Sequence, residues 1–229
     1  MKTIISIALV TLVSLNLCAQ EIEPARQQPK FSFGFAPLSL LFNKTRFELE
    51  TGVGKKSPVM ISVSPIFYSG TTQMYSNTRH IKPDNSEADY SSDLVSGMGG
   101  EMGIKFMKVL DPFHLSMIYY GFGVGYHKIN LSYQDYDFQP YQEDGLTYYN
   151  YQLGDVREDI QRTNVFGLLG GRTYAGNRIY FDLSIGLGYQ KSNIKSSAFQ
   201  PRDHESSIFG FGYTGFCYKA VLSVGFSLF

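Results

Sequence analysis

The chain has 229 residues, and its 20 Lys and Arg residues balance 20 Asp and Glu residues, which gives a formal net charge of zero. This balance removes the electrostatic reason to expect nucleic acid as a partner. Aromatic residues make up 15% of the sequence, which argues against wholesale disorder. The length allows one domain of the larger β type.

The N-terminus has the form of a secretory signal peptide. The basic residue Lys2 precedes an apolar run from Ile4 to Leu17, and the small residue Ala19 follows it. A basic start, a short apolar core and a small residue at the cleavage site are typical of such signals, and the run is too short to span a membrane as a helix. We therefore expect residues 1–19 to be removed and residues 20–30 to form a periplasmic N-terminal segment.

Cysteine usage follows from that cleavage site. Cys18 lies within the signal, so Cys217 is the single cysteine of the expected mature chain and no intrachain disulfide is predicted. Lipidation of Cys18 is the alternative processing route, although that route favours a small residue before the cysteine, where Leu17 stands. Without a disulfide, we expect sheet closure and packing to hold the fold together.

After the signal, the sequence has no apolar run long enough for a transmembrane helix, and its main pattern is an alternation with a period of two. The clearest case runs from residue 179 to residue 190. One face is apolar, with Ile179, Phe181, Leu183, Ile185, Leu187 and Tyr189. The other face is mostly polar or very small, with Tyr180, Asp182, Ser184, Gly186, Gly188 and Gln190. Residues 117–127, 100–107 and 46–53 alternate in a similar way.

Two features of these stretches favour a membrane barrel over a soluble sandwich. Glycine recurs on the polar face, which suits a crowded concave interior. The predicted strands reach about 10 residues or more, whereas soluble strands average about 5–6 and a tilted strand needs about 9–11 to span a bilayer. The pattern predicts an all-β fold, a transmembrane antiparallel up-and-down β-barrel in the outer membrane of a Gram-negative bacterium. A soluble, lipocalin-like barrel is the alternative.

The spacing of the alternating segments predicts eight strands. We place them at residues 31–41, 44–53, 59–69, 96–109, 114–132, 163–174, 179–195 and 218–229. Short connectors alternate with long ones near 70–95, 133–162 and 196–217, as expected for periplasmic turns and external loops of a barrel over 31–229. Residues 206–216 fit either a lengthened last strand or a folded loop, and a ten-stranded barrel is the alternative. The strand from residue 114 is expected to outrun the bilayer, with a slip in its alternation at Ile129 and Leu131.

The end of the chain resembles a known assembly signal. A terminal Phe229 on an alternating strand is similar to the signal read by the barrel-assembly machinery, although a bulge near Ser227 is needed to bring it into phase. Together with the segments Pro37–Phe42, Arg46–Glu50 and Gly212–Gly215, it resembles the small outer-membrane β-barrel family common in Bacteroidota, of the OmpA/OmpX type at fold level. The resemblance implies the fold and the outer-membrane location, and it brings no catalytic residues.

Charged residues recur on the predicted inward faces. They are Arg46, Glu48, Glu50, Glu101, Lys105, Arg172 and Asp182. Buried charges must be paired and hydrogen-bonded, and eight strands leave an interior just wide enough for side chains. We therefore expect a structural salt-bridge network that closes the lumen. A narrow passive channel, opened when the network parts, is the alternative.

Candidate chemistry outside the lumen is sparse. The histidines are His80, His114, His127 and His204, and His204-Glu205-Ser206 makes the closest approach to a catalytic set. Residues so close within one loop seldom form a working triad, so we expect no enzyme, with an outer-membrane enzyme acting on lipid as the less favoured alternative. Asp135 and Asp137 offer Ca²⁺ ligands without the EF-hand spacing, and we expect neither a metal nor a cofactor.

The predicted loop 133–162 is acidic and rich in tyrosine. Tyrosine supplies large contact area at low entropic cost, and loops on a rigid scaffold are where binding concentrates. We therefore expect a structural or surface-interaction role: a monomeric barrel in membrane lipid whose loops bind an extracellular ligand. Deleting residues 135–158 is expected to leave barrel assembly intact, because no predicted strand is cut.

Overall fold

The computed structural model describes residues 29–53, 59–72, 93–111, 116–176, 178–198, 204, 208 and 210–228. The predicted signal peptide, most of the predicted N-terminal segment, the terminal Phe229 and most of the 70–95 connector lie outside the described residues.

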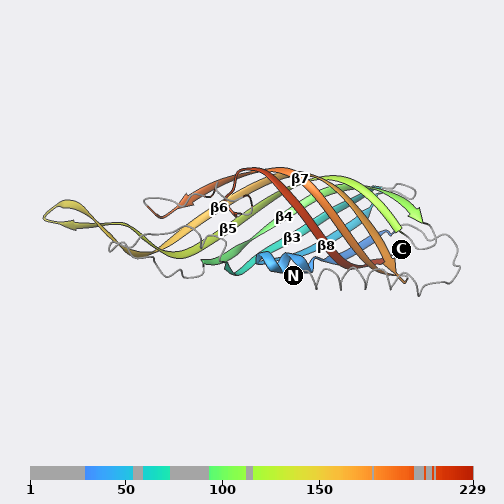
Figure 1. Ribbon diagram of the computed structural model, residues 1–229, viewed down its shortest axis with the longest axis horizontal. Coiled ribbons are helices and arrows are strands. Elements are labelled where there is room, and N and C mark those ends of the chain that lie inside the picture. The colour runs from blue at the N-terminus through green and yellow to red at the C-terminus, as the bar shows by residue number, and fades with distance from the viewer. Residues whose placement is uncertain are drawn as a thin grey trace.

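Eight antiparallel strands close into one barrel (Figure 1). Each strand pairs with its neighbour in sequence, and β1 closes the ring against β8. The strands are β1 (Phe31–Phe35), β2 (Lys44–Gly52), β3 (Val59–Thr72), β4 (Asp93–Asp111), β5 (Ser116–Glu143), β6 (Leu146–Ala175), β7 (Ile179–Ser196) and β8 (Gly215–Leu228). The predicted eight-stranded up-and-down barrel is confirmed. The ten-stranded alternative is wrong, because residues 210–214 precede β8 without joining the sheet.

The first strand is shorter than predicted because a helical turn follows it. β1 ends at Phe35, and the 3-10 helix η1 (Pro37–Phe42) begins two residues later. Pro37 has no backbone N–H for a sheet ladder, but it fits the first turn of a helix. Asn43 ends the helix with a φ of 55°, and its backbone N–H donates to the carbonyl of Leu40 at 3.1 Å. The predicted strand over 31–41 is corrected accordingly.

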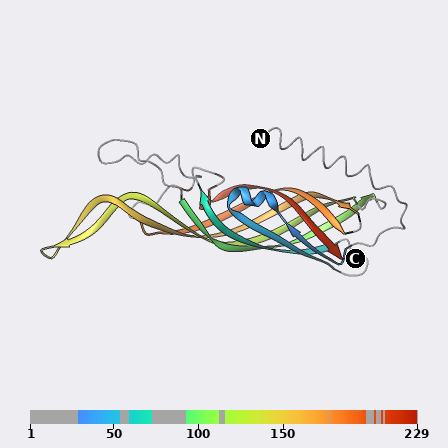
Figure 2. The same cartoon turned by 90° about the horizontal axis from the view of Figure 1, so that it is seen from below.

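β5 and β6 are much longer than predicted, with 28 and 30 residues, and they form a hairpin that projects beyond the other strands (Figures 1 and 2). The hairpin closes through Asp144 and Gly145, whose φ angles of 52° and 75° suit a two-residue type I′ turn. The prediction of a loop over 133–162 is therefore wrong: these residues pair from Tyr133↔Val156 up to Glu143↔Leu146. Deleting residues 135–158 would cut both strands.

The two ends of the barrel differ. The connections from β2 to β3, β4 to β5 and β6 to β7 lie at one end, together with the start of β1 and the end of β8; we call this the turn end. The helix η1 and the β5–β6 hairpin lie at the opposite end, which we call the hairpin end (Figure 1).

The closing pair of strands keeps one register. β1 and β8 pair without a break from Phe31↔Leu228 to Phe35↔Val224. The hydroxyls of Ser32 and Ser227 lie 2.7 Å apart inside the barrel. The bulge expected near Ser227 is therefore wrong, because the ladder passes through this residue regularly.

The two faces of the wall have opposite character. Outward side chains between the turn end and the middle of the barrel are mostly large, apolar and exposed, whereas inward positions are polar, charged or glycine. Glycine makes room for the inward ring of Tyr180. A Cβ at Gly34 would lie 2.5 Å from the Tyr180 hydroxyl oxygen, and a Cβ at Gly225 would lie 2.4 Å from the Cζ atom of the same ring. No helix in the described part of the chain is long and apolar enough to cross a membrane.

Candidate functional site

The seven charged residues predicted for the lumen all lie inside the barrel. Each is at most 8% exposed: Arg46, Glu48, Glu50, Glu101, Lys105, Arg172 and Asp182. They come from β2, β4, β6 and β7, and alternation alone turns them inward.

Two cations and three acids form the group nearer the turn end. Arg172 Nη2 lies 2.6 Å from Glu50 Oε2 and 2.8 Å from Asp182 Oδ2, and Arg172 Nε donates to Asp182 at 2.9 Å. Lys105 Nζ donates to Glu50 at 2.6 Å and to Glu48 at 3.0 Å. Glu50 therefore links the two cations, and the group is a single network.

Aromatic rings complete the environment of this group. The Tyr119 hydroxyl donates to Asp182 at 2.6 Å, and Lys105 Nζ lies 4.8 Å from the centre of the Tyr119 ring. The Arg172 guanidinium lies 4.1 Å from the centre of the Tyr180 ring. Cation–π contacts of this kind strengthen where water is excluded, so the rings stabilise the cations as well as filling space.

A second group surrounds Glu101, nearer the hairpin end. Glu101 accepts hydrogen bonds from both Arg46 and Lys219. Arg46 Nη2 also donates to the Ser64 hydroxyl at 2.9 Å, and Lys219 Nζ lies 3.5 Å from the centre of the Phe166 ring. Lys219 was not predicted to face the lumen, and neither were the buried Arg162 and Glu158, which the prediction placed in a loop. The signal in the sequence is the alternation of β8, which turns Lys219 to the same inward side as Ser223 and Ser227.

Lys219 brings the charges of the network into balance. Four bases face four acids: Arg46, Lys105, Arg172 and Lys219 against Glu48, Glu50, Glu101 and Asp182. These eight side chains are neutral as a set.

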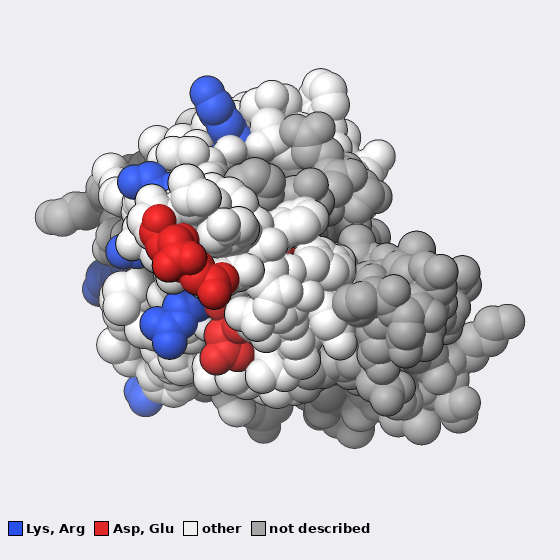
Figure 3. All heavy atoms as spheres, turned by 90° about the vertical axis from the view of Figure 1, so that its left-hand side faces the viewer, with Lys and Arg blue, Asp and Glu red and all other residues white. Residues whose placement is uncertain are grey.

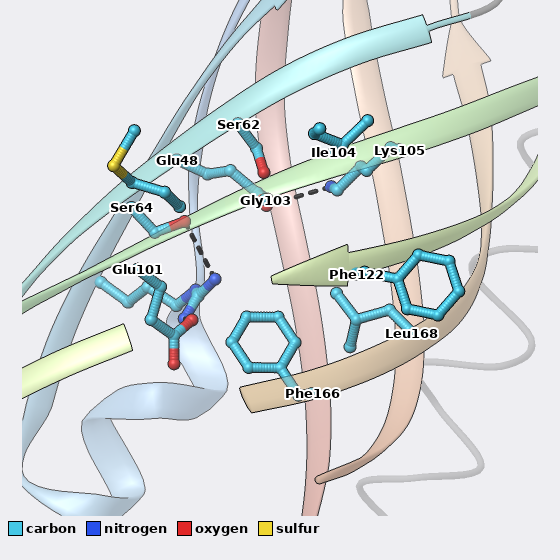
Figure 4. A pocket seen from close by; sticks show the side chains of 12 residues that line it. Glu48, Ser62, Ser64, Glu101, Gly103, Ile104, Lys105, Phe122, Phe166 and Leu168 are labelled. Carbon is cyan, nitrogen blue, oxygen red and sulfur yellow. Dashed lines mark hydrogen bonds and ion pairs between the residues drawn. The ribbon is translucent and has the colours of Figure 1, made fainter. Parts of the chain in front are cut away.

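Little space remains between these side chains. A cavity of about 10 Å³ lies between the two groups, at Gly103, where Glu48, Glu101 and Phe166 meet (Figure 4). This is roughly the space of one water molecule. The lumen at this level is therefore packed.

A hydrogen-bonded chain lies on the hairpin side of Glu101. Arg162 Nη2 donates to the Tyr68 hydroxyl at 2.8 Å, and that hydroxyl lies 2.9 Å from His127 Nδ1. The His127 side chain is buried in the wall, 3.8 Å from Glu101. His127 is thus part of the packing of the lumen.

An apolar cluster closes the barrel at the hairpin end. Phe211, which precedes β8 in the chain, turns into the barrel mouth and is 1% exposed. Its ring meets the Tyr68 ring edge-on at 6.1 Å. We call this cluster the upper plug; its buried members are Ile66, Tyr68, Val95, Ile129, Leu131, Tyr133, Val156, Ile160 and Phe211.

The segment that carries Phe211 is tied to the wall by a histidine. His204 Nε2 lies 2.7 Å from Glu158 Oε2, and the Tyr133 hydroxyl donates to Glu158 Oε1 at 2.8 Å. Both His204 and Glu158 are buried. Glu205 and Ser206, the other members of the weighed triad, lie outside the described residues.

A second apolar cluster closes the turn end. Its buried members, which we call the lower plug, are Met60, Met107, Met117, Tyr119, Tyr174 and Tyr180. The charged network is thus enclosed between two apolar layers, and an ion crossing the lumen would have to pass both.

The two faces of β5 exchange character near Tyr126. On the turn-end side the outward residues are Ile118, Tyr120, Phe122, Val124 and Tyr126. Beyond it the outward residues are polar, with Lys128, Asn130, Ser132 and Gln134, while the inward residues become apolar, with Ile129, Leu131 and Tyr133. The slip predicted at Ile129 and Leu131 is therefore a change in the apolar pattern alone: β5 pairs with β4 and β6 continuously through these residues.

Beyond the barrel, the hairpin is a two-stranded ribbon. Among the described residues, β4 pairs with β5 only as far as Leu94↔Ser132, and β7 pairs with β6 only as far as Glu158↔Ser196. One face is aromatic, with Tyr136, Phe138, Tyr149 and Tyr151; the Tyr151 ring lies 5.8 Å from that of Tyr136 and 5.1 Å from that of Phe138.

The ribbon is also acidic. Residues 133–156 contain five acids and no Lys or Arg: Asp135, Asp137, Glu143, Asp144 and Asp155. In the view onto the hairpin end, acidic side chains form a stripe with basic side chains beside it (Figure 3). No group of three or more His, Cys, Asp or Glu residues in the described part of the chain has an arrangement that could hold a metal ion.

No protein-family model and no curated protein matches the sequence. Among solved structures, the chain is similar to the crystal structure of CarO from Acinetobacter baumannii, with a TM-score of 0.40 and 7% identity, over 88% of this chain and 98% of that one. A similarity at this level says nothing about the function of this chain. The resemblance to the Bacteroidota barrel family stays a prediction.

Proposed function

We propose that the protein is an outer-membrane barrel of a Gram-negative bacterium that acts as a closed, rigid anchor for the β5–β6 hairpin. The exchange of faces at Tyr126 carries this proposal. On β5 the apolar outward face runs from Ile118 to Tyr126, nine residues, and on β7 from Ile179 to Tyr189, eleven residues. These are the lengths that a tilted strand needs to cross a bilayer.

The inward face supports the same location. A soluble barrel places its apolar side chains inside and its polar ones outside, and this chain does so only beyond Tyr126, where the upper plug lies. Below that level the outward side chains are apolar, and the interior holds the charged network and, at the turn end, the lower plug. We propose that the turn end faces the periplasm and the hairpin end the exterior, with insertion by the barrel-assembly machinery as a monomer.

The proposed role is surface interaction and includes no catalysis. The base of the hairpin is held in the barrel by β4, which pairs with β5, and by β7, which pairs with β6. The ribbon beyond it presents exposed aromatic rings to the exterior. Exposed apolar patches that are rimmed by polar residues mark interaction sites. A narrow passive channel remains the competing function, favoured by the charged lining of the lumen.

A conductance measurement separates the two functions. The purified barrel in planar bilayers is expected to give no steady current, because the neutral network and the two plugs leave no continuous water path. The positive control is the same preparation with a known porin added to the bilayer, which shows that a channel would be detected. Steady, stepwise conductance from the barrel alone would favour the passive channel.

Shortening the hairpin tests its independence from the barrel. We expect replacement of residues 138–151 by Asn-Gly to leave barrel stability unchanged within about 0.5 kcal/mol, because Asp137 and Gln152 are paired and can be joined by a two-residue turn. The variant keeps Glu158, which the wider deletion of 135–158 would remove. Heat-modifiable gel migration and urea titration report stability, and adhesion of whole cells to host or bacterial surfaces reports binding. Failure of the variant to assemble would make the ribbon part of the scaffold.

A further inference from the structure

The apolar outer face of the barrel has a hollow. Gly167 lies at an outward position of β6, between Phe122 of β5 and Leu187 of β7. Because glycine has no side chain, the apolar surface has a notch at this position. The notch belongs to an open groove of about 1030 Å³ whose lining extends from Ile61 on β3 to Tyr218 on β8 and includes Val165 and Leu187 beside the notch. The lining is almost entirely apolar.

Basic side chains lie directly on the hairpin side of this groove. Lys128 follows Tyr126 by two residues on β5, and Lys191 follows Tyr189 by two residues on β7. Both are exposed, and the single strand β6 separates them, where Thr163 is opposite Lys191 and Gln161 is opposite Lys128. Neighbouring strands are about 4.8 Å apart and the two positions are offset by two residues of about 3.3 Å along β6, so the two lysines stand roughly 12 Å apart at the wall.

The belt around these lysines is cationic. The outward residues of β5, β6 and β7 just beyond the apolar band include four bases, Lys128, Arg157, Lys191 and Lys195, and two acids, Asp155 and Asp159. The belt therefore carries a net charge of +2, in contrast to the acidic ribbon farther out.

We propose that this surface binds a membrane lipid whose headgroup carries more than one phosphate. Its acyl chains lie in the groove at Gly167, and its phosphates contact Lys128 and Lys191. The site faces the leaflet at the hairpin end. This inference rests on the proposed outer-membrane location, and it adds the lipid as a specific ligand.

The chemistry of the surface selects this ligand. A lysine ammonium is a compact cation that suits phosphate oxygens, and basic residues near a membrane surface attract anionic headgroups. Aromatic rings such as Tyr126 and Tyr189 are typical of the level at which headgroups begin. Two cations about 12 Å apart suit two phosphates on one headgroup better than a single phosphodiester.

The test compares lipid binding to matched variants in detergent micelles by native mass spectrometry. The probes are bisphosphorylated lipid A, monophosphorylated lipid A and phosphatidylglycerol. The double variant Lys128→Gln with Lys191→Gln is expected to lose about 30-fold in affinity for bisphosphorylated lipid A. The control, Lys30→Gln with Lys108→Gln, removes two exposed lysines at the turn end and is expected to bind as the wild type does.

A third variant tests the groove without changing charge. Val165→Phe places a ring in the hollow on the exposed outer face and is expected to weaken binding of all acylated probes. Equal affinity of the lysine variant and its control, or equal affinity of the wild type for phosphatidylglycerol and bisphosphorylated lipid A, would overturn the site. Cell fractionation decides the proposed location independently: a barrel found in the outer membrane that binds no lipid selectively overturns this inference alone.

Discussion

Replacing Arg172 by Met is expected to lower the free energy of unfolding of the barrel by about 3–5 kcal/mol. The guanidinium is the partner of both Glu50 and Asp182, and the variant leaves these two carboxylates close together and buried with less compensation. Removing one member of a buried ion network costs more than the network contributes as a whole, because the remaining charges stay desolvated. Urea titration in lipid vesicles, followed by far-ultraviolet circular dichroism and heat-modifiable gel migration, measures the loss.

The matched control for Arg172 is Arg157→Met. Arg157 is exposed on the outer face of β6, beyond the apolar band, so its loss is expected to change stability by no more than about 0.5 kcal/mol. Equal effects of the two substitutions would mean that the lumen is hydrated and that Arg172 is not a structural cation.

Replacing Phe211 by Ala is expected to destabilise the barrel by about 3 kcal/mol or more and to open its outer mouth. The ring is surrounded by the upper plug, and its removal leaves a cavity that the rigid wall cannot close. The expected result has two readouts: a lower urea midpoint, and faster labelling of a cysteine placed at Leu131. The control Phe138→Ala removes an exposed ring of the ribbon and is expected to change neither. Unchanged labelling in Phe211→Ala would show that other residues close the mouth.

Alternation explains why much of the lumen could be predicted. Where outward residues are apolar and inward ones charged, as at Glu48 and Asp182, the phase of the strand is visible in the sequence and fixes the direction of each side chain. Lys219 obeys the same phase on β8, where Ser223 and Ser227 also face inward.

The hairpin could not be recognised in the same way. The outward residues of β5 that follow Tyr126 are polar, so residues 133–162 combine the composition of a loop with the geometry of a strand. The turn at Asp144-Gly145 was the available signal, since this dipeptide favours the type I′ hairpin turn. The contact between His204 and Glu158 joins residues 46 positions apart, and no local pattern indicates it.

The position of the membrane boundary on β5 tests most directly the proposal that the barrel spans the outer membrane. Spin labels are placed one at a time at the outward positions 118, 120, 122, 124, 126, 128, 130 and 132, in a Cys217→Ser background that removes the half-buried cysteine. Relaxation by oxygen, which partitions into lipid, and by a water-soluble nickel chelate is then compared in bilayers. We expect oxygen to dominate from 118 to 126 and the chelate to dominate from 128 onward. Access of the chelate to positions 120–124 would contradict the proposed location, because these side chains would then face water and the barrel would not span the bilayer.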